Sequence, residues 1–384
     1  MRAGDAVTTS TLASVRTHAV ARGFFASADL QHALDTFGFV QADPIRAPAR
    51  AQDLTLRHRV AGYCAGDLES RFEALAVEED FFINYGFMTP AVHALLHPRA
   101  RKTWPRVRQA RADAILAFIR ERGVAHPREV EQEFQHGRVT NYWGGSSNAT
   151  THLLELMHFR GLLRVVRRDA GIRVYGVREP AAEIADLDPD AKLDALVDVI
   201  VQMYAPLPGA SLSALVRRLR WGAPQWSARV PKALARAKHR LARASVEGTD
   251  WYWPAGETPG GYEADDRVRL LAPFDPVVWD RRRFELLWGW AYRFEAYTPV
   301  AKRKLGYYAL PLLWREDVVG WANAAVKDGS LTLELGYVAG RAPKPRAFAR
   351  ELEAEVERMR DFLRIRIRPY VGGGSSDPPQ HRRV

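Results

Sequence analysis

The spacing of apolar residues divides the chain into three helical segments and a β-rich segment that follows them. In each of the first three segments, apolar residues recur every three or four positions and then alternate with polar residues over short stretches. The first spacing is typical of an amphipathic helix and the second of a half-buried strand. The pattern therefore predicts three units, each with helices followed by a small sheet, ahead of a region made of strands.

The second of these units has the clearest pattern. Two alternating stretches flank an Asp-Ala-Gly turn, which predicts a β-hairpin. Three helices precede the hairpin, and this order with a basic hairpin is typical of a winged helix. The helices are expected over 105–122, over 127–134 and from Ser147 onward, and the hairpin strands over 162–168 and 172–177.

The first unit follows the same plan more faintly. Ser27 can cap a helix that Gly38 ends. The stretch 39–43 is typical of extended backbone that ends at Pro44, and residues 81–83 are expected to form a strand.

The third unit contains an acidic helix over about 190–200, a short helix from Ser211 and a basic helix over about 231–244. Cations spaced by threes and fours along the last helix lie on one face of it. This basic stripe consists of Arg229, Lys232, Arg236, Arg240 and Arg243.

The last part of the chain is β-rich and predicts an antiparallel sheet or small barrel. The expected fold class is α+β, with three tandem winged-helix domains followed by a C-terminal antiparallel β-barrel. The expected domains are 1–100, 101–182 and 183–262 for the winged helices, 263–340 for the barrel, 341–370 for a C-terminal helix and 371–384 for a disordered tail.

Composition narrows the function classes. The 384 residues exceed what one core usually serves, and 56 Lys+Arg against 45 Asp+Glu give a net charge of +11, which favours an anionic partner. A single cysteine, Cys64, excludes an internal disulfide framework and a Cys-rich zinc site. No apolar run is long enough to cross a bilayer, and the first residues lack the apolar core of a secretory signal. We therefore expect a cytoplasmic protein without a membrane partner.

Gln41 and Asp43 are the candidate catalytic pair. Side chains of an extended segment alternate between two faces, so these two are expected to point the same way while Ala42 points back. An amide and a carboxylate side by side could hold one water molecule, and the carboxylate could orient or deprotonate it. Such a pair suits hydrolysis through an oxocarbenium-like transition state. The alternative is structural, with Asp43 capping a turn before Pro44.

Three stretches of the sequence resemble one enzyme family. Residues 39–54 (FVQADPIRAPARAQDL) resemble the signature of the winged-helix DNA glycosylases of the AlkZ/YcaQ type, in the subgroup that carries Gln-x-Asp. Residues 271–283 (LAPFDPVVWDRRR) and 292–311 (YRFEAYTPVAKRKLGYYALP) are similar to downstream parts of the same family. The resemblance extends from about residue 9 to residue 338.

The resemblance implies a fold, a reaction and a partner. The fold would be three winged helices and a β-barrel that form a C-shaped clamp around double-stranded DNA, and the protein would act as a monomer. The reaction would be base excision repair by a monofunctional glycosylase, which hydrolyses the bond between deoxyribose and an alkylated purine of the N7-alkylguanine type. Some members also unhook interstrand crosslinks. Gln41 and Asp43 would be the catalytic residues, with no metal and no other cofactor. A cationic purine leaves readily, so no strong general acid is needed.

The chain departs from this family at three places. The middle residue of Gln-x-Asp is Ala42 instead of a larger aliphatic residue. Residues 81–87 lack the Glu and the His of the family's Glu-Tyr-Trp-x-His-like run, and residues 321–323 replace a common Arg and Asp. These departures concern lesion preference more than fold.

Basic residues of several segments are candidate DNA contacts. Each guanidinium that neutralises a phosphate makes binding more sensitive to salt, whereas the alternative for any one of them is a solvated surface. The candidates are Arg46, Arg50, Arg164, Arg167, Arg168, Arg173, Lys232, Arg236, Arg240, Arg243, Lys302 and Arg303.

Other interpretations remain open at this stage. His93 and His97 share a helix face but lack a third ligand, so they are expected to be surface or core histidines. A non-enzymatic winged-helix DNA-binding protein or regulator is the main alternative to the enzyme. Such a regulator usually reads two half-sites as a dimer, whereas three modules on one chain can clamp DNA as a monomer. A winged-helix scaffold for small molecules or proteins is the third possibility.

Overall fold

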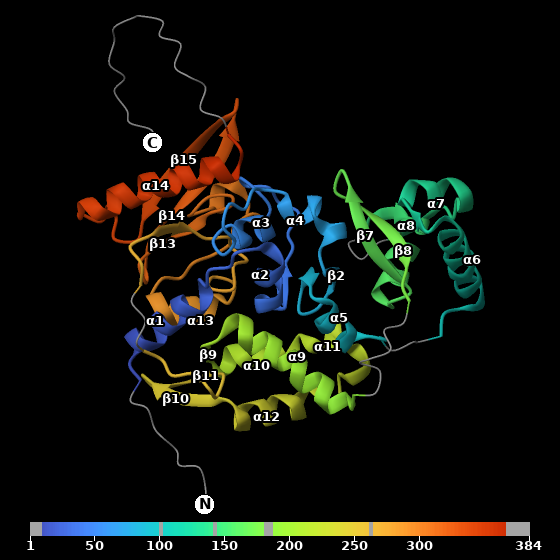
Figure 1. Ribbon diagram of the computed structural model, residues 1–384, viewed down its shortest axis with the longest axis horizontal. Coiled ribbons are helices and arrows are strands. Elements are labelled where there is room, and N and C mark those ends of the chain that lie inside the picture. The colour runs from blue at the N-terminus through green and yellow to red at the C-terminus, as the bar shows by residue number, and fades with distance from the viewer. Residues whose placement is uncertain (1–9, 100–102, 141–143, 180–186, 261–263, 366–384) are drawn as a thin grey trace, which may run out of the picture.

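The computed structural model describes residues 10–99, 103–140, 144–179, 187–260 and 264–365 (Figure 1). The tail expected to be disordered, 371–384, lies outside these described residues. The described residues form three helix-and-sheet units and a fourth, C-terminal region of one sheet, two α-helices and one short 3₁₀-helix. Among the described helices, none combines the length and the apolar character needed to span a membrane.

The first unit occupies the centre of the molecule (Figure 1). Its antiparallel sheet has the order β1-β3-β2. Residues 82–83, which were expected in a strand, form the turn between β2 and β3, where Phe82 N donates to Asn84 O (2.9 Å). The elements are α1 (Leu12–Gly23), α2 (Leu30–Phe37), β1 (Phe39–Gln41), α3 (Ala51–Leu56), α4 (Asp67–Ser70), η1 (Phe72–Ala74), β2 (Glu78–Phe81), β3 (Tyr85–Met88) and α5 (Pro90–Leu96).

The second unit projects to one side of the molecule (Figure 1). The predicted hairpin is confirmed, and its two strands join β4 in a sheet of order β4-β8-β7. The third helix begins two residues later than predicted, because Ser147 belongs to a short strand. The elements are α6 (Arg106–Arg122), β4 (Val124–Ala125), α7 (Pro127–Phe134), β5 (Arg138–Thr140), β6 (Ser146–Asn148), α8 (Ala149–Phe159), β7 (Leu163–Asp169) and β8 (Ile172–Val177).

The third unit, like the second, runs from a helix through a short strand and further helices to a hairpin, but its described residues have no counterpart of the β5-β6 pair. Its basic helix was expected to reach residue 244 but ends at Arg240, because Leu241 is extended and the residues after it pair with β11. The elements are α9 (Pro189–Tyr204), β9 (Leu207–Pro208), α10 (Gly209–Arg217), α11 (Leu219–Gly222), η2 (Pro224–Trp226), α12 (Val230–Arg240), β10 (Ala242–Val246) and β11 (Thr249–Trp253).

The C-terminal region corrects the prediction of a barrel. Within the described ranges its strands form an open four-stranded antiparallel sheet of order β12-β13-β14-β15, and no closed barrel is found. The free edge of β12 is covered by a helix: Glu355 accepts from Leu270 N (3.0 Å), and Arg358 donates to Val268 O (3.0 Å). Backbone groups occupied in this way cannot pair with another strand. The elements are β12 (Val268–Leu270), α13 (Arg281–Trp288), η3 (Val300–Lys302), β13 (Leu310–Trp314), β14 (Asp317–Lys327), β15 (Ser330–Tyr337) and α14 (Arg346–Phe362).

Strand β1 lies between two hydrophobic cores. Phe39 belongs to the core that the first unit shares with the third, and Val40 belongs to the core shared with the C-terminal sheet. Ala42, just after the strand, packs against the second of these cores. Phe39, Val40 and Ala42 thus alternate between the two faces as predicted, which leaves Gln41 on the same side as Phe39. The strand ends at Gln41, so the shared face of Gln41 and Asp43 stays a prediction.

Candidate functional site

Gln41 is held at the end of β1 by an unusually close strand. It lies opposite Gly86 of β3, and one further ladder bond joins Ala42 N to Tyr85 O (3.0 Å). A Cβ atom added to Gly86 would lie 2.3 Å from Val40 O and 2.6 Å from the ring of Phe39. Only glycine fits there, so β3 can approach β1 closely and fix the backbone that carries Gln41.

Asp43 follows the last ladder bond and is 9% exposed. Its Oδ1 accepts from Ile45 N (2.9 Å), which is the turn cap that the structural alternative predicts. Its Oδ2 accepts no bond from the described part of the chain and is not among the fully buried polar atoms, so solvent can reach it. Burial raises the pKa of Asp43, although the bond from Ile45 N opposes this. One oxygen thus anchors the carboxylate while the other is open to water.

Two of the stretches that resemble the glycosylase family, 39–54 and 292–311, meet at this site although they are far apart in sequence. Tyr308 and Val40 belong to the same core, against which Ala42, Ile45 and Phe294 also pack. Burial raises the pKa of Tyr308, and the nearby charge of Asp43 raises it further. The signature around Asp43 is therefore next to the stretch 292–311 in space.

The amide of Gln41 also has a partner that the sequence did not reveal. Asn84, in the turn between β2 and β3, donates its Nδ2 to Gln41 Oε1 (2.8 Å). Asn84 in turn bonds through Oδ1 to Arg218 Nη2. In the sequence, the only feature that pointed to Asn84 was the departure from the family pattern at residues 81–87.

The arginines of the second hairpin are engaged within the chain. Arg168 and Arg173 both pair with Glu79 of β2, and Arg164 pairs with Glu78 (3.1 Å). Burial alone would raise the pKa of Glu79, but the hydrogen bond and charge of Arg168 lower it below its usual range. The predicted basic wing is thus largely an ion-pair contact between the second and first units.

The remaining hairpin candidate, Arg167, is more exposed but pairs with Asp169 (3.0 Å). The hairpin cations that keep substantial exposure are Arg164 and Arg167, whereas Arg168 is largely covered. The sequence could not show this, because Glu78 and Glu79 precede the hairpin by more than eighty residues.

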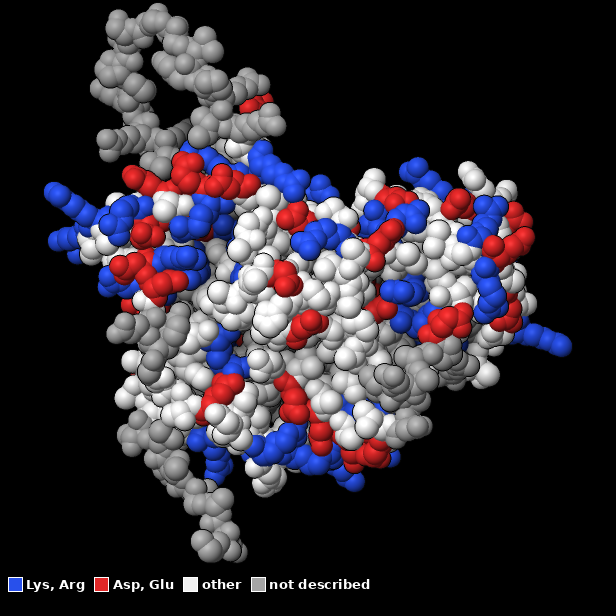
Figure 2. Space-filling view, in the orientation of Figure 1, with Lys and Arg blue, Asp and Glu red and all other residues white. Residues whose placement is uncertain are grey.

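The basic stripe of the third unit faces an acidic stripe. Arg236 bonds to Asp194 (2.8 Å), and Arg240 bonds to Asp198 (2.5 Å). Arg229 pairs with Asp190 (3.1 Å) in the same way. Figure 2 shows acidic and basic side chains next to one another along this edge of the molecule. Helix α12 therefore does not present a stripe of unpartnered cations.

The other candidates for DNA contact differ in exposure. Lys232 is exposed, and Arg243 is exposed but lies on β10 instead of on α12. Arg46 and Lys302 are exposed, Arg50 pairs with Glu69, and Arg303 donates to Thr298 O (2.8 Å).

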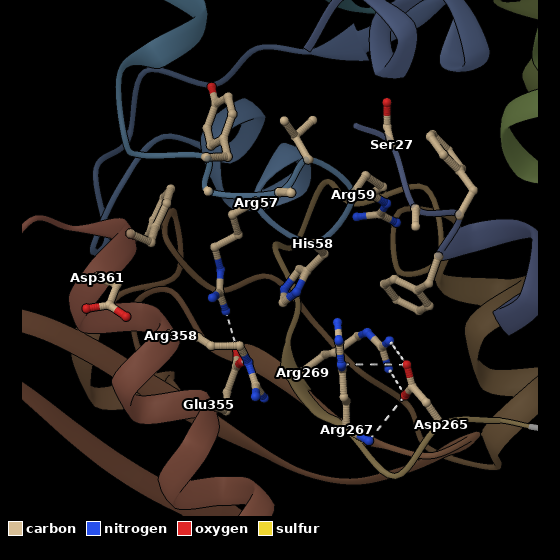
Figure 3. Close-up of a pocket in the computed structure, with 18 of the residues that line it drawn as sticks. Ser27, Arg57, His58, Arg59, Asp265, Arg267, Arg269, Glu355, Arg358 and Asp361 are labelled. Atoms are coloured by element: carbon tan, nitrogen blue, oxygen red, sulfur yellow. Dashed lines mark hydrogen bonds and ion pairs between the residues drawn. The ribbon is translucent and has the colours of Figure 1, made fainter. Parts of the chain in front are cut away.

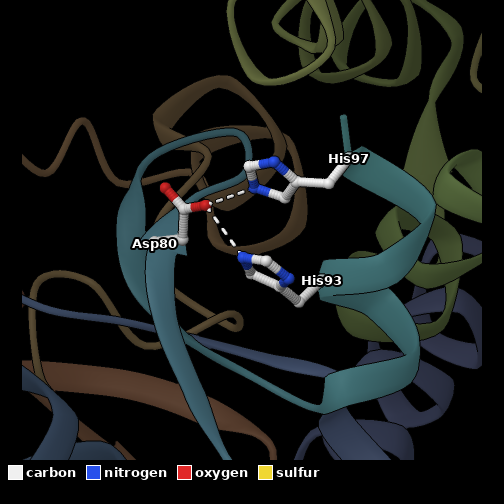
Figure 4. A group of neighbouring side chains, drawn as sticks. All are labelled: Asp80, His93 and His97. Carbon is white, nitrogen blue, oxygen red and sulfur yellow. Dashed lines mark hydrogen bonds and ion pairs between the residues drawn. The ribbon is translucent and has the colours of Figure 1, made fainter. Parts of the chain in front are cut away.

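A buried polar cluster supports the sheet that carries the site (Figure 4). His93 of α5 and His97, the residue just after this helix, direct their Nε2 atoms at Asp80 Oδ2 of β2, at 3.1 and 2.8 Å. Asp80 was missed as their neighbour in the sequence, and the three ligand atoms lie close enough to hold a metal ion. However, Arg99 donates to both oxygens of Asp80 (3.0 Å each) and already supplies the positive charge. We interpret the cluster as a structural contact.

A cavity elsewhere in the molecule is a second candidate for a binding site (Figure 3). It measures about 630 Å³ and is lined by residues 57–64 after α3, by strand β12 and by helix α14, without Gln41 or Asp43 in its wall. Its buried cations are paired: Arg57 with Glu355, and Arg269 with Asp265 (2.6 Å). The candidate site is therefore not this pocket, and an enzyme that acts on a large substrate does not need an enclosed cavity.

The comparisons with known proteins decide between the functions left open by the sequence. The family model described as DNA glycosylase AlkZ-like matches residues 34–362, most of the chain. The chain belongs to the AlkZ-like DNA glycosylase family. It is accordingly a DNA glycosylase, an enzyme of DNA repair that acts on DNA, and the family membership favours this over a non-enzymatic regulator.

A solved structure supports the fold of this AlkZ-like chain. The Streptomyces sahachiroi DNA glycosylase AlkZ is similar with a TM-score of 0.59 and 14% sequence identity, over 92% of this chain and 97% of that chain. At this identity the likeness concerns the arrangement of the elements, and the roles of individual residues are argued below from their geometry.

Proposed function

We propose that the protein hydrolyses the N-glycosidic bond of alkylated purines, of the N7-alkylguanine type, in double-stranded DNA. The observation that carries this proposal is Asp43, a largely buried carboxylate with one oxygen anchored and one open to solvent. In this mechanism Asp43 orients a water molecule and takes its proton, while Gln41 helps to hold the water. The negative charge also stabilises the sugar as it becomes cationic.

The cationic base explains why a carboxylate and an amide suffice. An N7-alkylguanine carries a positive charge before the bond breaks, so it departs as a neutral base without protonation. The bond between C1′ and the base nitrogen breaks with its electrons going to the base, and the water oxygen forms the new bond to C1′. Removal of the base from interstrand crosslinks is part of the proposal when the crosslink joins such nitrogens. Three helix-and-sheet units, interpreted as winged helices, would allow a monomer to bind the duplex.

An exposed loop beside the site is the proposed lesion contact. Between α13 and β13 the chain exposes Tyr297 (81%), Val300 (75%) and Tyr307 (45%). Lys302 and Lys304 are exposed in the same loop. Aromatic rings stack on bases and ammonium groups contact phosphates, so this combination suits a distorted duplex better than it suits a solvated surface. The loop lies near Asp43, because Asp43 and Tyr297 both act on the pKa of Tyr308.

Replacing Tyr297 by Ala is expected to weaken binding to a duplex with N7-methylguanine. Stacking of a base on an aromatic side chain is worth about 1–3 kcal/mol, so affinity should fall roughly 5- to 150-fold. Fluorescence anisotropy at fixed salt measures this change. The control is Tyr297→Phe, which keeps the ring and should bind like the natural protein. Equal affinity of the Ala variant would remove this loop from the lesion contact.

The experiment that tests the proposed function is an abasic-site assay. A duplex with one N7-methylguanine is incubated with the protein and then treated with alkali, which breaks the strand at abasic sites. Strand breaks at the lesion and release of free 7-methylguanine are expected. A mobility shift without breaks, for this duplex and for one with an N7-linked crosslink, would instead support a DNA-binding protein that does not act on these lesions.

A further inference from the structure

The amide of Gln41 is the last member of a hydrogen-bond chain that begins in the third unit. Arg218, at the C-terminal end of α10, donates Nε to Ile83 O (2.7 Å) and Nη2 to Asn84 Oδ1. Asn84 then donates Nδ2 to Gln41 Oε1 (2.8 Å). Two bonds from one guanidinium therefore fix both the backbone and the side chain of the turn that touches the site.

The chemistry of arginine fixes which group donates and which accepts in each of these hydrogen bonds. A guanidinium carries only donors, so the group that faces Arg218 must be the oxygen of the Asn84 amide. The nitrogen of that amide must then face Gln41, and a nitrogen donor requires an oxygen on the Gln41 side. The orientation of both amides thus follows from the identity of Arg218.

From this we infer that Asn84 and Arg218 are positioning residues, which make Gln41 present its NH₂ group, and not its carbonyl, to the reacting water. The inference rests on the proposed function for its chemistry. Gln41 Nε2 has no acceptor in the described part of the chain and is not among the fully buried polar atoms. The water then accepts a hydrogen bond from Gln41 Nε2 and donates its proton to Asp43, so each of the two groups has one role.

The surroundings keep this chain in place. The turn that carries Asn84 is pressed between units, because a Cβ atom added to Gly222 of α11 would lie 2.2 Å from Phe82 O. The guanidinium of Arg218 also lies over the rings of Trp221 and Trp279, at 5.4 and 5.5 Å from their centroids. Arg218 of the third unit thus orients the Gln41 amide of the first unit, so the geometry of the site depends on how these two units pack together.

The decisive variant is Asn84→Asp. A carboxylate has the same shape and keeps its bond to Arg218, but it offers only acceptors to Gln41. The Gln41 amide should therefore turn over and point its carbonyl oxygen at the water. A carbonyl oxygen donates no hydrogen bond, so the water loses the bond that it accepted from the Gln41 NH₂ group. We expect kcat for N7-methylguanine release to fall at least about tenfold while KM stays within about twofold. Arg220→Gln is the matched control. Arg220 is exposed on the adjacent α11 and takes no part in the hydrogen bonds from Arg218 to Gln41, so this variant should leave kcat and KM unchanged.

A second measurement reports on the amide without any turnover. Protein labelled with ¹⁵N at glutamine shows the Gln41 side-chain NH₂ signal, which is assigned by its loss in Gln41→Glu. In the natural protein these protons should exchange freely with water. In Asn84→Asp one of them should shift downfield and become protected, because it now bonds to a carboxylate.

The outcomes separate this inference from the proposed function. A changed NH₂ signal together with the loss in kcat supports both. A changed signal in a protein that releases no base from any lesion supports the positioning role and removes the proposed function. An unchanged signal, or an Asn84→Asp enzyme with the natural kcat, overturns the inference while the natural enzyme's activity continues to support the function.

Discussion

Replacing Asp43 by Asn is expected to lower the single-turnover rate of N7-methylguanine release by about 10²- to 10⁴-fold, the usual contribution of a general base. The amide keeps the shape of the carboxylate and can still accept the bond from Ile45 N. It can neither take a proton from water nor stabilise a cationic sugar. Quenched-flow sampling of the released base measures the rate.

The same variant should be at least as stable as the natural protein. Because burial raises the pKa of Asp43, the folded state disfavours the charged carboxylate, and this cost grows as the pH rises and the group ionises. Removing the charge is therefore expected to raise the melting temperature, while affinity for the duplex is retained. A variant that loses activity because it unfolds, or one that cleaves at the natural rate, would contradict the role given to Asp43.

Replacing Arg99 by Met is expected to cost about 3–5 kcal/mol of stability, which is typical when one partner of a buried ion pair is removed. The Arg99 side chain is 1% exposed and joins three units. Besides Asp80, it donates to Phe81 O (2.5 Å), Phe159 O (2.6 Å) and Gly222 O (2.7 Å). The variant leaves Asp80 charged and buried with only the two histidines. Thermal unfolding followed by circular dichroism measures the loss.

Two further variants give this prediction its controls. Arg122, which is half exposed with a distant partner, should tolerate the same change to Met within about 0.5 kcal/mol. Adding Asp80→Asn to Arg99→Met removes the unpaired charge and should recover part of the stability. If Arg99→Met melts like the natural protein, the cluster is not the support that the geometry indicates.

The buried histidines add a pH dependence to this cluster. Burial lowers the pKa of His93 to about 3 and that of His97 to about 4, both from an ordinary value of 6.5. Their neutral forms therefore stabilise the fold above about pH 6.5, and this contribution is lost as the pH falls toward the folded values. Asp80, whose pKa is held well below its usual range mainly by Arg99 against the effect of burial, also loses its contribution in acid.

The elements that depend on local signals could be predicted from the sequence. The helix over 127–134 and the hairpin ending at residue 177 follow from spacing and turn residues alone, and both are present. The barrel was wrong because closure depends on what covers β12, and Glu355 and Arg358 of α14 lie about ninety residues further along the chain.

The candidate site shows the same limit. Gln41 and Asp43 could be proposed as the candidate pair because both signals for them are local: their spacing, and the stretch 39–54 that resembles the family signature. The sequence could not show which cations of the basic stripes are paired, because the partners Asp194 and Glu79 come from other elements, and their contact with DNA stays a prediction. Asn84 could not be assigned a role, since its importance depends on Arg218, more than 130 residues away.

The central claim is that the carboxylate of Asp43 prepares the attacking water, and a pH–rate profile tests it most directly. Single-turnover release of 7-methylguanine is measured across pH for the natural enzyme and for Asp43→Asn, with the enzyme-free loss subtracted. The natural rate should rise along one acid limb whose midpoint lies above the ordinary Asp pKa of 3.8, and this limb should be absent in the variant. A natural rate that does not change with pH, or the same limb in both proteins, would contradict the claim.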